Sequence, residues 1–132
     1  MAFLEATNLH RTYRLGRRNK VYALRGVDMS IAAGEMVAIM GPSGCGKSTL
    51  MHILGLLHGP DRDLDPPATL SINGADVTGM SDKERTRMRA SSMGFVFQNF
   101  NLVPTLTAVE NVALPAVYSG RKRSEAKEAA AR

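Results

Sequence analysis

The segment that most constrains this chain is residues 41–49, which read GPSGCGKST and follow the apolar run at residues 36–40. They match the phosphate-binding pattern G-x-x-x-x-G-K-[ST], the P-loop, at every fixed position. Its glycines allow backbone conformations that a Cβ would hinder, so that successive N–H groups can point at one anion. The pattern belongs between a buried strand and a helix. We therefore expect a strand over 36–40 and a helix after the loop, in an α/β fold.

Two side chains of the loop contribute to phosphate binding in addition to the backbone amides. Lys47 brings a full positive charge, and the helix that begins near Gly46 directs the positive end of its dipole at the same phosphates. Ser48 can offer its hydroxyl to a bound Mg²⁺. The sequence thus predicts binding of a nucleoside triphosphate. The alternative, an ordinary glycine-rich turn, is disfavoured by the strand and helix patterns on either side.

Composition excludes several other classes. The chain has 132 residues, of which 44% are hydrophobic and 22% charged, which is typical of a globular domain rather than a disordered or fibrous one. Its longest uncharged stretch, residues 90–109, contains a proline and many polar residues and would be a poor membrane span. The first residues lack a signal-peptide pattern, and the single cysteine suits a reducing compartment. We expect a cytoplasmic setting.

The net charge of +5 comes from basic clusters within residues 11–20, 85–89 and 121–123. Clusters of this kind are more often solvated surface than a nucleic-acid site. We therefore expect no nucleic-acid partner.

Hydrophobic patterning predicts the elements around the loop. Residues 3–9 and 24–31 alternate between apolar and polar and indicate antiparallel strands, and residues 68–72 indicate a short strand that ends in an Asn-Gly turn. Residues 93–97 predict a further strand that ends at Gln98.

Helix signals follow later in the chain. Residues 81–84 and 107–110 each have the form of a capping box, which predicts a helix from 81 to about 90 and a second helix from 107 that Pro115 should stop. The alanine- and glutamate-rich tail from Ser124 predicts a last helix.

A strand-rich start, a P-loop near residue 45 and a glutamine 51 positions after the P-loop lysine together resemble the nucleotide-binding domain of ABC transporters. Residues 21–27 and 94–112 are similar to the subfamily whose ATPases work with macrolide-export or lipoprotein-release permeases. The resemblance covers the whole chain. It implies a P-loop NTPase core with an N-terminal antiparallel β subdomain, truncated before the signature loop.

The same resemblance implies that residues 1–132 are the N-terminal part of a single nucleotide-binding domain. Its expected regions are the antiparallel β region at about 1–34 and 68–74, the P-loop strand and helix at 35–57, the glutamine-loop region at 93–106, and the start of a helical subdomain at 107–132. The loop at 59–67 is longer and richer in Asp and Pro than the usual family connection.

Roles for individual residues also follow from the resemblance. Lys47 would contact the β- and γ-phosphates of ATP, and Ser48 and Gln98 would ligate Mg²⁺. Tyr13 would stack on adenine, with Tyr22 left as an alternative. The expected nucleotide-binding residues are Tyr13, Gly41, Pro42, Ser43, Gly44, Cys45, Gly46, Lys47, Ser48, Thr49 and Gln98.

In this family hydrolysis also needs an acidic strand end, a signature loop from a second copy and a later histidine, and none of these patterns occurs in the sequence. Apart from Lys47 and Gln98 we find no catalytic candidate, so these 132 residues alone are expected not to hydrolyse ATP. The implied partners are a transmembrane permease and a second ATPase copy, at the inner face of the membrane. An ABC-type ATPase acting on DNA and a nucleotide-binding module without turnover remain alternatives.

Overall fold

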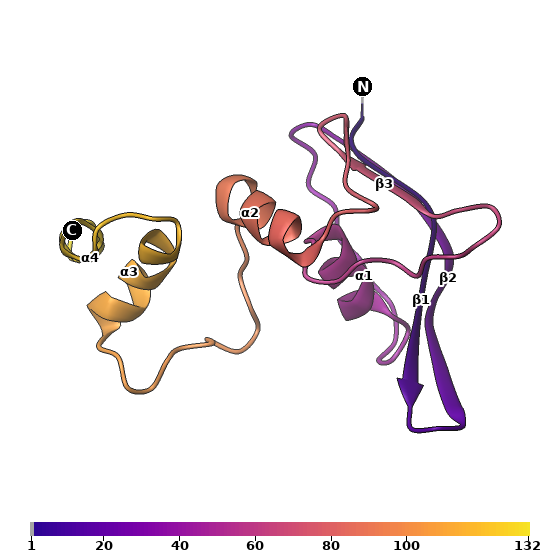
Figure 1. The fold of residues 1–132 in the computed structure, drawn as a ribbon, viewed down its shortest axis with the longest axis horizontal. Coiled ribbons are helices and arrows are strands. Elements are labelled where there is room, and N and C mark those ends of the chain that lie inside the picture. The colour runs from indigo at the N-terminus through magenta and orange to yellow at the C-terminus, as the bar shows by residue number, and fades with distance from the viewer. Residues whose placement is uncertain (1) are drawn as a thin grey trace. The chain divides into compact units, whose positions relative to one another are not determined.

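The computed structural model describes residues 2–132. The chain forms two compact units, the first up to Thr86 and the second from Arg87 onward. The boundary lies within helix α2 (Asp82–Ser92), which has no buried residue. The first unit contains the sheet and the P-loop, and the second contains the two C-terminal helices (Figure 1).

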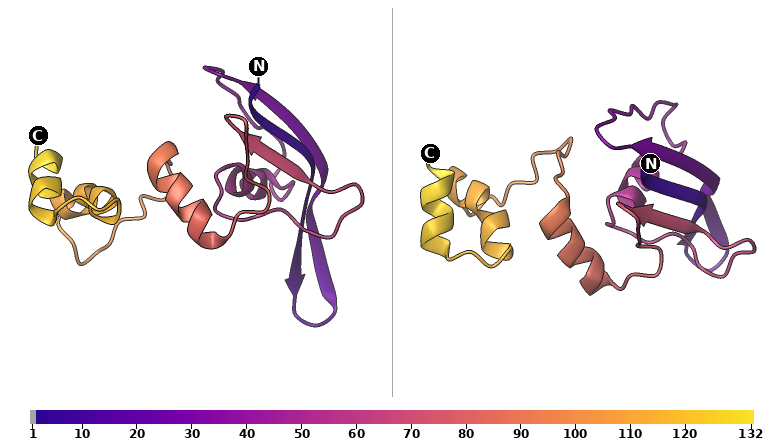
Figure 2. Two further views of the ribbon diagram at one scale, coloured as in Figure 1. Left: turned by 45° about the horizontal axis from the view of Figure 1, so that its top comes forward. Right: turned by 90° about the horizontal axis from the view of Figure 1, so that it is seen from above.

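The first unit is built on a four-stranded antiparallel sheet. Its strands are β1 (Ala2–Leu15), β2 (Asn19–Ala32), β3 (Thr69–Ile72) and β4 (Ala75–Asp76), in the order β2-β1-β3-β4. The expected antiparallel strands at the start of the chain and at 68–72 are confirmed. Because β3 pairs only with residues 4–7 of β1, the far end of the β1–β2 hairpin extends beyond it as a two-stranded arm (Figures 1 and 2).

Helix α1 (Lys47–Leu54) contributes to the core of this unit. It buries Leu50, Ile53 and Leu54, whereas the sheet contributes alternate residues such as Leu4 and Ala6. The helix begins at Gly46, which has a φ of 96°. The predicted helix after the P-loop is therefore confirmed, and its apolar side holds the loop against β2.

Two expected strands are absent. Residues 36–40 and 93–97 are irregular, and every strand pairing within residues 2–132 involves β1 to β4. A strand needs a neighbour to accept and donate its backbone hydrogen bonds, and the sheet of the described residues offers these segments none. Their apolar side chains are exposed instead, with Met36 98%, Met40 88% and Val96 102% exposed.

The second unit pairs α3 (Ala108–Tyr118) with α4 (Arg123–Ala130). Both predicted capping boxes are present. The Ser81 hydroxyl accepts from the Glu84 amide in α2, and Thr107 does the same for Glu110 in α3. Ala113 and Ala126 are buried, which lets the two helices of this unit pack closely.

The prediction that Pro115 stops its helix is wrong, because α3 continues to Tyr118. Proline has a helical φ, and within a helix it loses one backbone hydrogen bond and crowds the preceding turn. The last turn is still hydrogen-bonded, since the Pro115 carbonyl accepts from both the amide and the hydroxyl of Ser119, at 3.0 and 2.9 Å.

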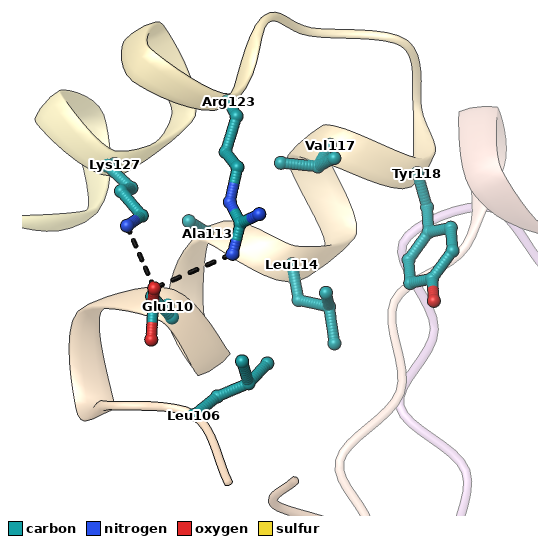
Figure 3. A pocket seen from close by; sticks show the side chains of 8 residues that line it. All are labelled: Leu106, Glu110, Ala113, Leu114, Val117, Tyr118, Arg123 and Lys127. Carbon is teal, nitrogen blue, oxygen red and sulfur yellow. Dashed lines mark hydrogen bonds and ion pairs between the residues drawn. The ribbon is translucent and has the colours of Figure 1, made fainter.

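Glu110 joins the two helices of this unit, as Figure 3 shows. Its Oε2 accepts from the Thr107 amide at 3.0 Å, and its Oε1 accepts from Lys127 of α4 at 2.8 Å and lies 3.6 Å from Arg123. The hydrogen bond from Lys127, followed by those from Thr107, lowers the pKa of Glu110 from 4.5 to about 2.

Among the described helices, none is long and apolar enough to cross a membrane.

Candidate nucleotide-binding site

The P-loop connects the end of β2 to α1 by a path that requires glycine. Gly44 and Gly46 have φ values of 81° and 96°, which L-residues rarely adopt. A Cβ on Gly46 would lie 2.4 Å from the Ala23 carbonyl oxygen of β2, whereas one on Gly44 would meet nothing within 4 Å. Gly46 thus lets the loop approach the sheet, and Gly44 supplies a turn in open space.

The ammonium of Lys47 is fixed by its own loop. Its Nζ donates to the carbonyl oxygens of Gly41 at 2.7 Å and Pro42 at 2.6 Å, and lies 3.6 Å from the Sγ of Cys45. The Cys45 amide in turn donates to the Pro42 carbonyl at 3.4 Å, which closes the loop. The positive charge is thereby held beside the loop's backbone amides, where an anion would bind.

A pocket of about 530 Å³ opens over the loop. It brings together one aromatic ring, from Tyr13 of β1, and the P-loop residues that carry the charge and the hydroxyls. Its full lining is Tyr13, Val21, Ala23, Ser43, Gly44, Gly46, Lys47, Ser48 and Thr49. Gly41, Pro42 and Cys45 are outside this lining, and the first two act through their carbonyl groups on Lys47.

Strand register places the two candidate tyrosines on different faces of the hairpin. Tyr13 is opposite Val21, whereas Tyr22 is opposite Thr12, and neighbouring pairs alternate between faces. Tyr13 accordingly lines the pocket with Lys47, and Tyr22 lines another pocket with Thr12. The structure thus brings Tyr13 and the P-loop together and leaves Tyr22 out.

Arg11 is a residue of this region that sequence reasoning missed. Its guanidinium lies 5.1 Å from the centroid of the Tyr13 ring, donates to the Gly59 carbonyl at 3.0 Å and faces Asp61 at 3.9 Å. The Asp-rich loop therefore fixes a cation on the ring of Tyr13. The spacing of Arg11 and Tyr13 along one strand was the only available signal, since their contact with residues 59–61 is not local.

Gln98 belongs to the second unit, in the irregular segment between α2 and α3. Its expected joint action with Ser48 stays a prediction. Within residues 2–132, no group of three or more His, Cys, Asp or Glu side chains could hold a metal ion. Hydroxyl and amide oxygens, such as those of Ser48 and Gln98, are a different class of ligand that also suits Mg²⁺.

Comparison with known proteins gives a consistent result. Residues 24–132 match the family model described as ABC transporter. The chain is 46% identical over 126 residues to the macrolide export ATP-binding/permease protein MacB of Chlorobaculum tepidum, covering 96% of this chain and 18% of that protein. It is also 46% identical to the lipoprotein-releasing system ATP-binding protein LolD of Ruegeria pomeroyi, covering 89% of this chain and 49% of that protein.

A solved structure has the same fold. It is a dimeric ATP-binding cassette in a post-hydrolysis state, bound to ADP and Pi. The two chains superpose with a TM-score of 0.82 and are 38% identical, and the match covers 96% of this chain and 53% of the cassette chain. The expected α/β fold class is thereby confirmed. The present chain spans about half the length of this cassette and of the LolD relative, and less than a fifth of the MacB relative.

Proposed function

Because the chain belongs to the ABC transporter family, we propose that it is the ATP-binding part of a transporter's motor subunit. The observation that carries this proposal is the pocket over the P-loop, which joins the Tyr13 ring to Lys47 and Ser48. An aromatic face, a fixed ammonium and a row of loop amides are the chemistry that a purine nucleoside triphosphate requires. The family is one of ATPases, and we propose that hydrolysis is a property of the complete domain rather than of these 132 residues.

Each residue has one task in this proposal. Tyr13 stacks on the adenine, backbone amides of residues 43–49 surround the phosphates, and Lys47 binds the β- and γ-phosphates. Ser48 fits a Mg²⁺ ion because its exposed hydroxyl lies at the start of α1 beside Lys47. The side-chain oxygen of Gln98 is the second protein ligand that the family resemblance implies. When bound, Mg²⁺ would neutralise phosphate charge.

We further propose that two copies close around ATP and act on a membrane permease from the cytoplasmic side. The solved cassette that resembles this chain is dimeric, and the MacB and LolD relatives are named as parts of export and release systems. In the second unit Phe100 and Leu102 are 89% and 63% exposed. Exposed apolar side chains after Gln98 suit a contact with a partner protein.

Titration with a fluorescent ATP analogue in the presence of Mg²⁺ tests nucleotide binding. We expect Lys47→Ala to lose most of the affinity, because it removes the charge on the phosphates. Tyr13→Ala should weaken binding about tenfold, as expected for a lost stacking contact. Tyr22→Ala is the matched control and should change affinity less than twofold.

Circular dichroism of each variant checks that the fold is intact. Unchanged affinity in Lys47→Ala would contradict nucleotide binding at the P-loop. Equal losses in Tyr13→Ala and Tyr22→Ala would contradict the assignment of Tyr13 to adenine.

A further inference from the structure

A second pocket, of about 280 Å³, lies at the far end of the β1–β2 hairpin, and we call it the basic pocket. It is formed by Thr12, Arg14, Lys20 and Tyr22 of the hairpin and by Asp61, Arg62 and Leu64 of the Asp-rich loop. The loop is anchored there because the Asp61 amide donates to the His10 carbonyl of β1 at 2.8 Å. None of its residues lines the pocket over the P-loop.

The basic pocket has an excess of positive charge. The lining contains three cations, Arg14, Lys20 and Arg62, and one carboxylate, Asp61, so two positive charges are left over. Asp61 is also 3.9 Å from Arg11, which draws its charge away from the pocket. The site therefore suits a doubly charged anion.

Strand pairing makes this excess of positive charge unfavourable for the stability of the protein when no anion is bound. Arg14 is directly opposite Lys20 in the register of β1 and β2, and like charges at such positions destabilise a sheet. Among the described residues neither side chain forms a hydrogen bond or an ion pair. An anion between them would turn their repulsion into two favourable contacts.

The remaining walls indicate what such an anion is attached to. Thr12 offers a hydroxyl, and the half-exposed ring of Tyr22 lies beside the cations, with Arg25 at 5.6 Å from its centroid. We propose that the basic pocket binds a phosphomonoester. Such a group has a charge of about −1.5 to −2 at pH 7, which matches the excess, and its oxygens suit arginine forks. The Tyr22 ring covers the organic part.

The test uses the full chain with Lys47→Ala, so that phosphate binding at the P-loop does not contribute. Glycerol 3-phosphate is titrated calorimetrically, and binding to phosphatidylcholine vesicles with and without phosphatidic acid is measured by sedimentation. We expect binding to at least one of these phosphomonoesters, and Arg14→Gln with Lys20→Gln should weaken it at least about tenfold. The matched control is Arg17→Gln with Arg18→Gln, which removes the same charge from the hairpin turn outside the pocket.

Binding of the soluble ester identifies a free metabolite as the source, and binding of phosphatidic acid vesicles alone identifies a lipid headgroup. Equal losses in the pocket variant and the turn variant would refute the proposal, because attraction would then depend only on net charge. No binding of either probe would also refute it. Because nucleotide binding is assayed separately with Lys47 intact, neither failure bears on the proposed function.

Discussion

Substitution of Gly46 by alanine tests how closely the P-loop must approach the sheet. The new Cβ would lie 2.4 Å from the Ala23 carbonyl oxygen and 3.2 Å from a Leu24 methyl carbon, in a backbone with a φ of 96°. The left-handed conformation costs an L-residue about 1–2 kcal/mol. Overpacking against a backbone carbonyl adds about 1–3 kcal/mol. We therefore expect Gly46→Ala to destabilise the first unit by about 2–5 kcal/mol.

The matched control is Gly44→Ala, whose Cβ would meet nothing within 4 Å although its φ is 81°. That change should cost only the conformational part, about 1–2 kcal/mol. Urea unfolding followed by circular dichroism gives both free energies of unfolding, and titration with the ATP analogue shows whether the loop still binds. A Gly46→Ala chain as stable as the Gly44→Ala chain would refute the close approach of loop and sheet.

Two further predictions concern Glu110 and the irregular apolar segment at residues 36–40. Since the folded pKa of Glu110, about 2, is below its ordinary value of 4.5, its contribution to the stability of the α3–α4 pair should be complete above pH 4.5 and should fall as the pH drops towards 2. A carboxyl carbon titration by NMR should give that low midpoint and Lys127→Met should raise it, whereas a wild-type midpoint near 4.5 would contradict the contact. We also expect the 132-residue chain to aggregate on heating, because Met36 and Met40 are exposed, and Met36→Gln with Met40→Gln should reduce light scattering. A sharp, reversible two-state melt of the wild-type monomer would disprove this second expectation.

The features that could be predicted from the sequence depend on residues close together in the chain. The P-loop is a contiguous motif, and each capping box joins residues three positions apart, so the pattern alone contains the whole interaction. Antiparallel pairing of the first two strands was likewise predictable, because a short turn fixes which residues meet. These local rules gave the start of α1, α2 and α3 and the hairpin.

Tertiary structure decided the rest, because those features depend on partners distant in sequence. Residues 36–40 have a strand's composition, but within residues 2–132 no strand lies beside them, and α3 continues past Pro115 to Tyr118. The choice between Tyr13 and Tyr22 depended on register, since a shift of one residue reverses the face to which a side chain points. Sequence determined that this chain has a phosphate-binding loop, and only the fold determined which aromatic ring and which cations surround it.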